Sequence, residues 1–564
     1  MNILGITLFT HDSSATLIRN NKIIGCSEEE RFSREKHTSK FPNLSIKFLL
    51  DEGGINSTDI DYVVIPHDPL KNYFSRIAFC LFNNKNFISA IKASFHNLLL
   101  FFKLKRDVKL LFQRHNMKLS NKCKIILFDH HSAHAASTFY VSGFNEAVVI
   151  TWDGRGEWPC LTVSKASKQK VQKIWEQTVP DSLGQFYESV TNFLGFNSYG
   201  DEYKVMGLSA YGKPKFYKEI KNIISLSNSG KVKIDSALWR YNIYKRNFGL
   251  GYDFKIKGIK KRLENEKLKK IHLDLAASTQ KVFNEIAEGI TKLAYKKFNS
   301  NNLCLAGGVA QNILMNQKIY LNSGFENFFV QPASHDAGLS LGAALLTQEK
   351  YSRKLEINEF TAFQGPKFSN SEIKQILDTF GLSYFKPKNI HIYTAKLIAK
   401  NFVIGWFQGK TEFGPRALGS RSILADPRNR KMKEIVNRKI KFRENFRPFA
   451  PSILEDFFNK YFENAPKNEF MCFSADVRKE MRKIIPAVTH FDGTARPQVV
   501  IKSNNPSFWK LIRCFYEITK VPLLLNTSFN VQGEPIVNSP HDAIKCFFSS
   551  GIDYLILENF VIKK

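Results

Sequence analysis

The feature that most constrains the fold is a pattern that occurs twice: an apolar strand, a turn that carries an aspartate, and a second strand. The first copy joins residues 2–8 to residues 15–19 through a turn with Asp12. The second copy begins with the apolar run 147–152 and turns at Asp153. Small and hydroxyl residues in such turns bring backbone N–H groups within reach of a phosphate. The duplication predicts an α/β nucleotide-binding fold made of two similar halves.

A pair of histidines follows another apolar run. Residues 125–128 are predicted to form a strand, and His130 and His134 lie one helical turn apart just after it. In a helix this spacing places both imidazoles on one face, where they can bind a metal ion together. An ordinary helical histidine pair is the alternative that the spacing leaves open. Asp153 and Asp336 each lie in an acidic turn after a strand.

A glycine pair marks a candidate phosphate contact. The strand predicted at residues 303–305 leads into a turn with Gly307 and Gly308, and a helix follows. Backbone N–H groups at a helix N-terminus can receive phosphate or ribose oxygens. This succession of strand, glycine pair and helix therefore predicts a nucleotide contact, and a long helix is predicted just before it at residues 273–298.

A polar stretch near residues 350–365 predicts a domain boundary, and the chain beyond it carries basic residues of an unusual kind. They lie among glycine, proline and aromatic residues rather than on a polar helix face. Guanidinium groups beside hydroxyl and amide side chains are the chemistry of phosphate and carboxylate recognition. Ordinary surface arginines are the alternative. The residues are Arg416, Arg421, Lys441, Arg443, Arg447 and Arg496.

The composition narrows the choice of partner and compartment. The 564 residues carry a formal net charge of +31, which favours an acidic partner such as a phosphate, a nucleotide, an anionic glycan, nucleic acid or a membrane surface. A lysine-rich composition without a special partner is the alternative. The eight cysteines are scattered without a Cys-x-x-Cys pair, and neither a secretory signal nor an apolar run of ~18–20 residues is recognised. We therefore expect a soluble, cytoplasmic protein without a disulfide framework.

Two segments, residues 71–120 and 213–271, differ from their neighbours. In the first, apolar side chains on one helical face precede a basic run. This pattern fits a helix packed on its own domain, or a basic amphipathic element that binds a membrane or an acidic partner. The second is predicted to be an insertion, and the charge-dense run 28–37 is predicted to be solvated surface. The apolar face consists of Phe87, Ile91, Phe95, Leu98 and Phe102.

A series of short motifs runs in one order over nearly the whole chain. In this series the chain resembles the NodU/CmcH-type O-carbamoyltransferases, and the segments 71–120 and 213–271 carry no motif of that family. The motifs are His11-Asp-Ser-Ser-Ala, Glu29-Glu-Arg-Phe, His130-His-Ser-Ala-His-Ala-Ala, Asp153-Gly-x-Gly-Glu, Tyr203-Lys-Val-Met-Gly-Leu, Leu305-Ala-Gly-Gly-Val-Ala, Gly405-Trp-Phe-Gln-Gly, Glu412-Phe-Gly-Pro-Arg-Ala-Leu-Gly-x-Arg-Ser-Ile-Leu, Phe446-Arg-Pro-Phe-Ala-Pro and Asn526-Thr-Ser-Phe-Asn.

The resemblance implies an α/β protein of two domains. Residues 1–355 resemble the two-lobed, ASKHA-type fold of the tRNA threonylcarbamoyl transferase TsaD, and residues 356–564 resemble the α/β protein YrdC. In the family, the C-terminal domain takes carbamoyl phosphate and ATP with Mg²⁺, forms carbamoyl-adenylate, and releases phosphate and pyrophosphate. The N-terminal domain holds a divalent metal ion, described as iron, and moves the carbamoyl group to an acceptor hydroxyl.

The resemblance also implies roles for individual residues. His11 matches the catalytic histidine, and we interpret it as the general base because imidazole titrates near neutral pH. The implied metal ligands are His130, His134, Asp153 and Asp336. The implied adenylate contacts in the N-terminal domain are Lys204, Gly207, Gly307, Gly308 and Asn312. The implied contacts to ATP and carbamoyl phosphate in the C-terminal domain are Arg416, Lys441, Arg443, Arg447, Arg496, Asn526, Ser528 and Asn530.

The expected function is ATP-dependent transfer of a carbamoyl group to a hydroxyl of a small molecule or glycan. An antibiotic, an aminosugar, a lipo-oligosaccharide and a nucleotide-linked sugar are all candidate acceptors, and the positive charge favours an anionic one. The alternative is a tRNA threonylcarbamoyladenosine-type synthase and transferase, which the charge also suits; a non-catalytic ASKHA scaffold is a third interpretation. The motifs are those of the small-molecule family, so nucleic acid is not the expected partner. The acceptor and the oligomeric state are left open.

Overall fold

The structure is a computed structural model of the 564-residue chain. It describes all residues except 9, 76, 79–86, 169, 198–199, 236–238, 243–248, 253, 353–359 and 445. The chain divides into two compact units. The N-terminal unit comprises Met1–Cys26 and Ser39–Phe360, and the C-terminal unit comprises Ser27–Thr38 and Thr361–Lys564. The predicted boundary between residues 355 and 356 lies outside the described residues.

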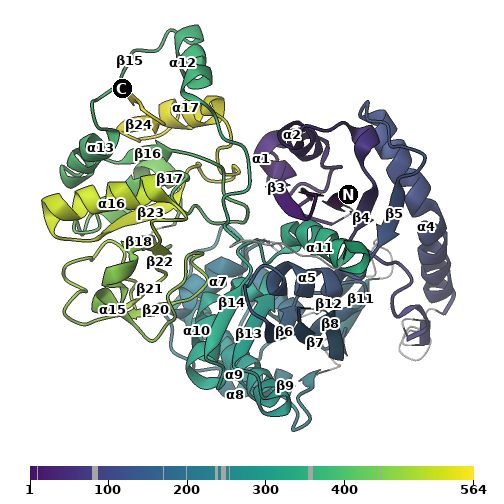
Figure 1. The fold of residues 1–564 in the computed structure, drawn as a ribbon. Coiled ribbons are helices and arrows are strands. Elements are labelled where there is room, and N and C mark those ends of the chain that lie inside the picture. The colour runs from purple at the N-terminus through teal and green to yellow at the C-terminus, as the bar shows by residue number, and fades with distance from the viewer. Residues whose placement is uncertain are drawn as a thin grey trace. The chain divides into compact units, whose positions relative to one another are not determined.

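Two five-stranded sheets of the N-terminal unit share one strand order (Figure 1). In each, the first strand pairs antiparallel with the second and parallel with the fourth. Ile3, Leu4 and Val149 on the central strands are fully buried, which explains why these strands are continuous apolar runs. The predicted duplication is therefore present. One sheet has the order β3 (Lys22–Glu28), β2 (Ser14–Arg19), β1 (Asn2–Thr7), β4 (Tyr62–Ile65) and β5 (Lys124–Leu127), and the other has the order β8 (Lys170–Thr178), β7 (Pro159–Ser167), β6 (Glu146–Trp152), β13 (Asn302–Ala306) and β14 (Asn327–Val330).

Two helices, α5 (His130–Phe139) and α11 (Leu339–Ser352), lie between these sheets (Figure 1). Helix α11 packs on β1 and β2, α5 packs on β6 and β13, and the two helices pack against each other. Glycine permits this close approach, because a Cβ atom on Gly342 would lie only 1.8 Å from the carbonyl oxygen of Ala133. The packing brings the start of α5 near the ends of β6 and β14.

Further elements surround the two sheets. Helix α4 packs through its C-terminal half, because Leu104, Val108 and Phe112 belong to the same apolar core as β1 and β4. Helix α9, predicted at residues 273–298, packs on α7, α8 and α10. The elements are α2 (Asn43–Gly53), α4 (Phe87–Arg114), α6 (Leu183–Phe193), α7 (Glu202–Ser209), α8 (Tyr217–Ile223), β9 (Ile224–Leu226), β10 (Val232–Ile234), β11 (Trp239–Asn242), β12 (Gly249–Tyr252), α9 (Lys270–Phe298) and α10 (Ile313–Asn322).

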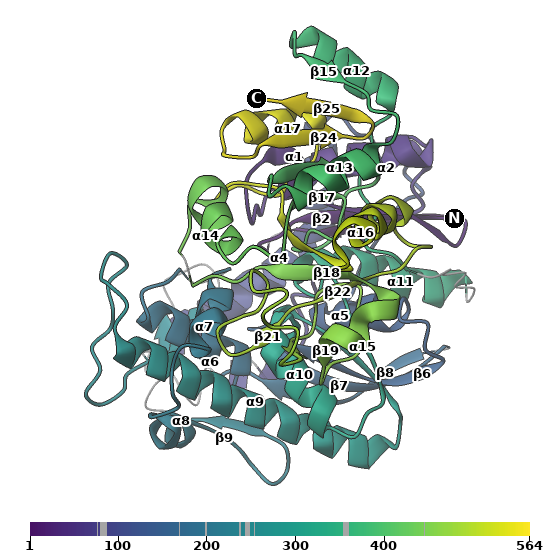
Figure 2. The same ribbon diagram turned by 90° about the vertical axis from the view of Figure 1, so that its left-hand side faces the viewer.

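The C-terminal unit is built on a mixed eight-stranded sheet (Figure 2). Helices α13 and α16 pack against each other and on the sheet, and α17 packs on β16 and β24. Trp406 and Phe407 are fully buried in an apolar core of this unit. The sheet has the order β15 (Tyr384–Phe385), β25 (Phe560–Lys563), β24 (Tyr554–Leu557), β16 (Ile404–Phe407), β17 (Arg421–Ala425), β23 (Leu523–Ser528), β18 (Ala450–Leu454) and β22 (Gln498–Val500). The other elements are α1 (Glu29–Ser33), α12 (Asn370–Thr379), α13 (Ile390–Ala399), α14 (Met432–Val436), α15 (Phe458–Tyr461), β19 (Phe462–Glu463), β20 (Ala475–Val477), β21 (Thr494–Ala495), α16 (Pro506–Thr519) and α17 (Pro540–Phe548).

The segment Ser27–Thr38 belongs to the C-terminal unit, although most of the N-terminal unit follows it in sequence. The prediction that the charge-dense run 28–37 is solvated was wrong for its first part. Glu28, Glu29 and Arg31 are only 2–3% exposed. Buried charges need partners, and the partners of this segment lie in loops of the C-terminal unit.

The mixed sheets and the helices of the two units confirm the predicted α/β fold class. A helix that could cross a bilayer is absent from the described residues, because none there combines sufficient length with sufficient apolarity.

Candidate metal centre and anion site

The histidine pair lies at the start of α5. The helix begins directly after Asp129, whose carboxylate accepts a hydrogen bond from the backbone N–H of Ser132 (3.1 Å). This N-cap satisfies one of the N–H groups that the first helical turn leaves free. Because they lie four residues apart in this helix, His130 and His134 project from one face, and both are buried.

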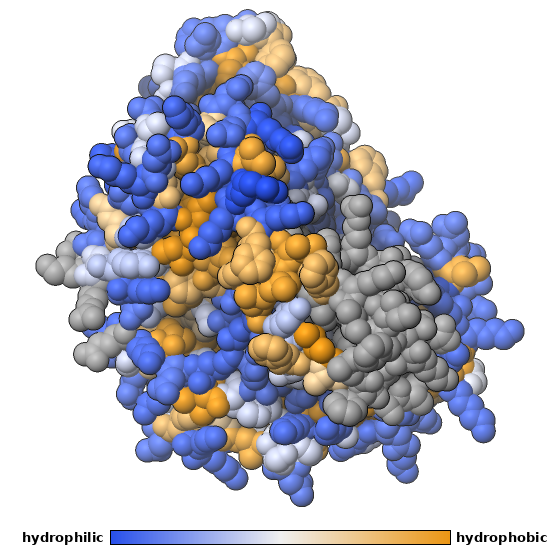
Figure 3. Space-filling view, turned by 90° about the vertical axis from the view of Figure 1, so that its right-hand side faces the viewer, coloured by the Kyte–Doolittle hydropathy of each residue, from blue (hydrophilic) through white to orange (hydrophobic). Residues whose placement is uncertain are grey.

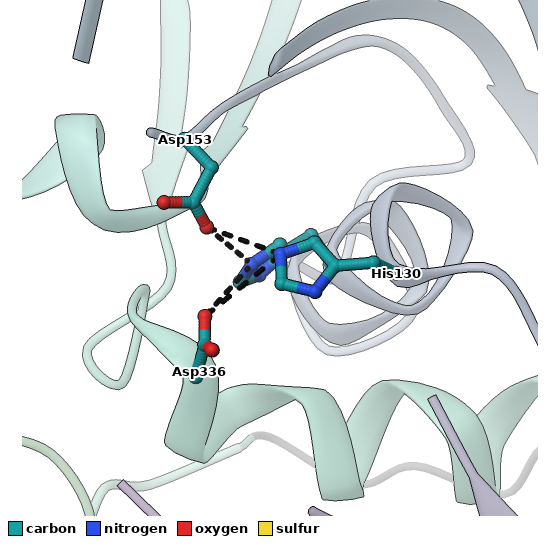
Figure 4. A group of neighbouring side chains, drawn as sticks. His130, Asp153 and Asp336 are labelled. Carbon is teal, nitrogen blue, oxygen red and sulfur yellow. Dashed lines mark hydrogen bonds and ion pairs between the residues drawn. The ribbon is translucent and has the colours of Figure 1, made fainter. Parts of the chain in front are cut away.

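Four side chains from the two halves of the N-terminal unit meet at one point (Figure 4). The Nε2 atoms of His130 and His134 each lie 3.1 Å from Oδ2 of Asp153 and 3.8 Å from Oδ1 of Asp336. One ligand atom of each residue lies within 4.8 Å of all the others. Asp153 directly follows β6, and Asp336 lies between β14 and α11. The ends of strands and the start of a helix thus supply all four groups.

This donor set fits a divalent metal ion. Two imidazole nitrogens and two carboxylate oxygens are ligands that first-row metals accept, with room for further ligands. Burial raises the pKa of Asp153, but its hydrogen bonds with His130 and His134 outweigh burial and hold that pKa well below its usual range. Asp153 is therefore ionised. Both imidazoles turn Nε2 toward the same carboxylate oxygen, which is the arrangement that a shared cation requires.

The first hairpin holds the loop that carries Asp336. The hydroxyl of Thr7, at the end of β1, donates to the backbone carbonyl of Asp336 (3.3 Å), and the hydroxyl of Ser14 donates to that of Ala337 (2.7 Å). All four residues are buried. One half of the duplicated fold therefore positions a ligand that belongs to the other half.

His11 lies in the turn between β1 and β2, with 37% of its side chain exposed. Its Nδ1 lies 2.7 Å from Oδ2 of Asp12. Burial lowers the pKa of His11, but Asp336 and Asp12 outweigh burial and raise that pKa to about 10. His11 thus keeps its proton at neutral pH as long as these carboxylates are uncompensated. A cation bound by Asp336 weakens this effect and favours the neutral imidazole.

Glu157 is a buried acid near the metal cluster that the sequence patterns did not assign to the site. Its carboxylate accepts hydrogen bonds from the backbone N–H groups of Asp68 (2.8 Å) and His130 (3.3 Å) and lies 3.6 Å from Nδ1 of His67. Burial raises its pKa to about 7. The sequence feature that could have identified Glu157 as a site residue is its position at the end of the motif that begins with Asp153.

The predicted glycine pair borders the metal cluster. Gly307 has φ = +90°, and a Cβ atom there would lie 2.0 Å from the carbonyl oxygen of Trp152, so only glycine fits. A Cβ atom on Gly308 would lie 3.3 Å from Oδ1 of Asp153. The backbone of this turn therefore passes within contact distance of a ligand residue.

The other predicted adenylate contacts lie on α7 and α10. Lys204 lies 3.0 Å from the carboxylate of Asp201, and a Cβ atom on Gly207 would meet no atom within 4 Å. Asn312 caps α10, because its Oδ1 accepts a hydrogen bond from the first turn (3.0 Å), and it exchanges two hydrogen bonds of 3.1 Å with Gln280. The amide of Asn312 therefore joins the start of α10 to α9.

In the C-terminal unit, three of the predicted nucleotide contacts, Lys441, Ser528 and Asn530, meet. Nζ of Lys441 donates to Oγ of Ser528 (3.1 Å) and to Oδ1 of Asn530 (2.7 Å). Burial and then Arg443 lower the pKa of Lys441 well below its usual value. The amide nitrogen of Asn526 donates to a backbone carbonyl (3.1 Å) and to a buried serine hydroxyl (2.9 Å), whereas its Oδ1 has no partner among the described residues.

Four predicted arginines form a cluster of like charge. Burial lowers the pKa of Arg496 well below its usual value, and Arg416, Arg443 and Arg447 lower it further. Nε of Arg496 is buried and donates to no atom of the described residues. The guanidinium of Arg443 stacks on Phe449, 4.7 Å from the ring centre. Half-buried guanidinium groups that repel one another favour a bound anion, so this arginine cluster is a candidate phosphate site.

Arg421 has a different place, although it belongs to the same set in the sequence. It is fully buried and stacks on Phe407 at 3.6 Å. It donates hydrogen bonds to the backbone carbonyls of Gln408 (2.9 Å) and Gly409 (3.1 Å). Arg421 is therefore neither a surface arginine nor part of the arginine cluster, but a residue that joins strands and loops of the C-terminal unit.

Glu28 and Arg31 hold the loop that leads to Arg416. Oε1 of Glu28 accepts a hydrogen bond from the backbone N–H of Gly414 (2.6 Å), and Nη2 of Arg31 donates to the carbonyl of the same residue (2.6 Å). The two side chains also form an ion pair of 3.3 Å. Gly414 has φ = +115°, a conformation that favours glycine. Sequence reasoning missed this clamp, although Arg31 lies in one of the quoted motifs.

Comparisons with known proteins match the N-terminal and the C-terminal parts of the chain to two family models. Residues 2–345 match the family model "Carbamoyltransferase N-terminus", and residues 395–564 match "Carbamoyltransferase C-terminus". The nodulation protein NolNO of Sinorhizobium fredii is 35% identical, with 99% of this chain and 79% of that protein covered. The uncharacterized protein sll1178 of Synechocystis is 37% identical, with 100% of this chain and 97% of that protein covered. The solved structure of HypF from T. kodakarensis is 13% identical and has a TM-score of 0.30, with 62% of this chain and 48% of that chain covered.

Two matching family models over most of the length define the class of protein as a carbamoyltransferase. The chain belongs to the carbamoyltransferase family, and within it to the NodU/CmcH type.

Proposed function

We propose that the protein is an ATP-dependent O-carbamoyltransferase that makes carbamoyl-adenylate in its C-terminal unit and transfers the carbamoyl group to a hydroxyl in its N-terminal unit. The observation that carries this proposal is the convergence of His130, His134, Asp153 and Asp336 beside the glycine turn. In a carbamoyltransferase this cluster is where an activated carbamoyl group and a hydroxyl can react.

Activation is assigned to the arginine cluster of the C-terminal unit. Water converts carbamoyl phosphate to carbamate and phosphate, and the carbamate oxygen then attacks the α-phosphorus of Mg²⁺-bound ATP, so that pyrophosphate leaves. Arg416, Arg443, Arg447 and Arg496 stabilise the phosphate charges of both substrates. Lys441 with its partners Ser528 and Asn530 contacts the nucleotide, and Oδ1 of Asn526 accepts a hydrogen bond from the carbamate nitrogen.

Transfer is assigned to the N-terminal unit. A divalent ion at the four-residue cluster, iron by family resemblance, would supply Lewis-acid polarisation of the carbamoyl carbonyl or the adenylate phosphate. His11 takes the proton of the acceptor hydroxyl as its oxygen bonds to the carbamoyl carbon and AMP leaves. Lys204, Asn312 and the backbone at Gly207, Gly307 and Gly308 bind the adenylate.

The acceptor class follows from the family and from the charge of the chain. We propose a hydroxyl of a small molecule or a glycan, and the net charge of +31 favours an anionic one. A purified sample, given ATP, Mg²⁺ and ¹⁴C-carbamoyl phosphate together with fractions of a cell extract, should label one acceptor fraction and release pyrophosphate and AMP in equal amounts.

The same assay separates the alternatives. Label that enters only RNA fractions would favour the tRNA-modifying alternative, and label that enters no fraction while ATP stays intact would refute the proposal. The His134→Ala variant serves as an internal control: it should still release pyrophosphate, because activation lies in the other unit, but should label no acceptor.

A further inference from the structure

Helix α4 has two apolar faces: one packs in the core, and the other is exposed where the structure describes its side chains. The inner face carries Leu104, Val108 and Phe112, which are fully buried against the first sheet. On the outer side, Phe95 is 59% exposed and Phe102 is 70% exposed. Residues seven positions apart lie on one side of a helix, so these two rings form a stripe opposite the inner face.

Two leucines extend this outer stripe. Leu99 is 37% exposed and lies between the two rings on the same side of the helix, and Leu110 is 41% exposed on that side, two turns beyond Phe102 and after Arg106. Single exposed apolar residues are common on protein surfaces, whereas a contiguous stripe marks an interaction site. Figure 3 views the side of the molecule that carries α4, where apolar side chains gather among hydrophilic ones.

Cationic side chains flank the stripe. Between residues 95 and 114 the sequence holds five lysines and arginines but one acid, Asp107, and these basic side chains are exposed. A second copy of the chain would bring two positive surfaces together, which costs free energy. A surface of negative charge above an apolar layer matches both the rings and the cations. The basic residues are Lys103, Lys105, Arg106, Lys109 and Arg114.

We propose that the outer face of α4 docks on an anionic phospholipid bilayer, with the helix lying in the plane of the interface. The rings of Phe95 and Phe102 enter the boundary between headgroups and acyl chains, and the flanking cations contact lipid phosphates. The helix is 28 residues long, and its apolar inner face stays in the protein core, so the contact is peripheral. This docking is independent of the proposed reaction.

The test is co-sedimentation of the full chain with vesicles. Phosphatidylcholine vesicles with about one-third phosphatidylglycerol should bind the protein at 0.1 M salt, and binding should fall at 0.5 M salt because screening weakens the lipid–cation contacts. The double variant Phe95→Ser and Phe102→Ser should bind at least tenfold more weakly. Phe491→Ser is the matched control, because Phe491 is 71% exposed in the C-terminal unit, and it should bind like the wild type.

Several results would overturn the proposal. If the protein binds pure phosphatidylcholine vesicles as well as the anionic vesicles, the cations do not direct binding. If the double variant binds the anionic vesicles as well as the wild type does, the apolar stripe is not the contact surface. A wild-type dimer in solution that the double variant converts to a monomer would assign the stripe to a second copy of the chain. Unchanged far-UV circular dichroism and pyrophosphate release will show that the double variant is folded.

Discussion

Replacement of Arg496 by methionine should change ligand binding and stability in opposite directions. Arg496 is half-buried, three other arginines lower its pKa, and its buried Nε has no acceptor among the described residues. In the free protein, the buried Nε–H group without an acceptor lowers the stability of the fold. When a phosphate is bound, the same group donates a hydrogen bond to it. Methionine keeps an unbranched side chain of similar length but removes the charge and the N–H groups.

The magnitudes follow from the bonds involved. A hydrogen bond to a charged group contributes about 1.5–3 kcal/mol, so Arg496→Met should weaken binding of Mg²⁺-ATP or pyrophosphate about 10- to 150-fold. A buried donor without an acceptor costs about 1–3 kcal/mol, and lost packing offsets part of the gain. We expect the free variant to be about 1 kcal/mol more stable, which raises the Tm of a unit of this size by roughly 2–4 °C.

Isothermal titration calorimetry measures the first change, and differential scanning calorimetry without nucleotide measures the second. Arg428→Met is the matched control, because Arg428 is paired with its own acid, Asp426, at 2.6 Å. That variant should lose stability and keep its affinity. If Arg496→Met binds pyrophosphate like the wild type, or unfolds at a lower temperature, Arg496 supports the fold and the anion site lies elsewhere.

Three further changes test other parts of the molecule. His134→Ala removes one of four converging groups, so metal content measured by mass spectrometry should drop below stoichiometry; full retention would contradict the metal assignment. Arg31→Met breaks the clamp on Gly414, so pyrophosphate release should fall at least tenfold while metal content stays unchanged; a loss of both would point to general unfolding. Burial, with Lys510, lowers the pKa of His391 to about 4, so the unfolded chain takes up this proton first. The free energy of unfolding should therefore fall by up to about 3 kcal/mol as the pH drops from 6.5 to 4. Urea titrations at several pH values should show a smaller fall for His391→Gln, and the same dependence on pH in the variant and the wild type would refute the role of His391.

Local patterns in the sequence were sufficient for the elements and for much of the candidate site. Strand β6 is buried on both faces, so it reads as an unbroken apolar run, and an aspartate directly after it marks its end. The spacing of His130 and His134 determines that they share a helical face, because this depends only on helix geometry. Such features are encoded within a few neighbouring residues.

Whether those residues meet was decided by tertiary structure. Asp336 lies about 200 positions from the histidines in the chain, and it reaches them because α5 and α11 pack closely at Gly342. The apolar period of α4 likewise predicted one helical face, but the fold buries Leu104 and leaves Phe102 exposed. Periodicity identifies an apolar face; only the neighbours of the helix determine which part of it is covered.

The arginines give the clearest division between sequence and structure. Composition and local context alone placed Arg421 and Arg496 in one group, because a guanidinium among glycines and aromatic residues has the same local signature in both cases. In the fold, the Nη atoms of Arg421 donate to backbone carbonyls, whereas Arg496 lies near other arginines that lower its pKa; Nε has no acceptor among the described residues in either side chain. The sequence determined that these side chains are cationic and embedded. Only the tertiary structure, which gives Arg421 backbone carbonyls as acceptors and places Arg496 near other cations, separated a residue that holds the fold from a candidate anion-binding residue.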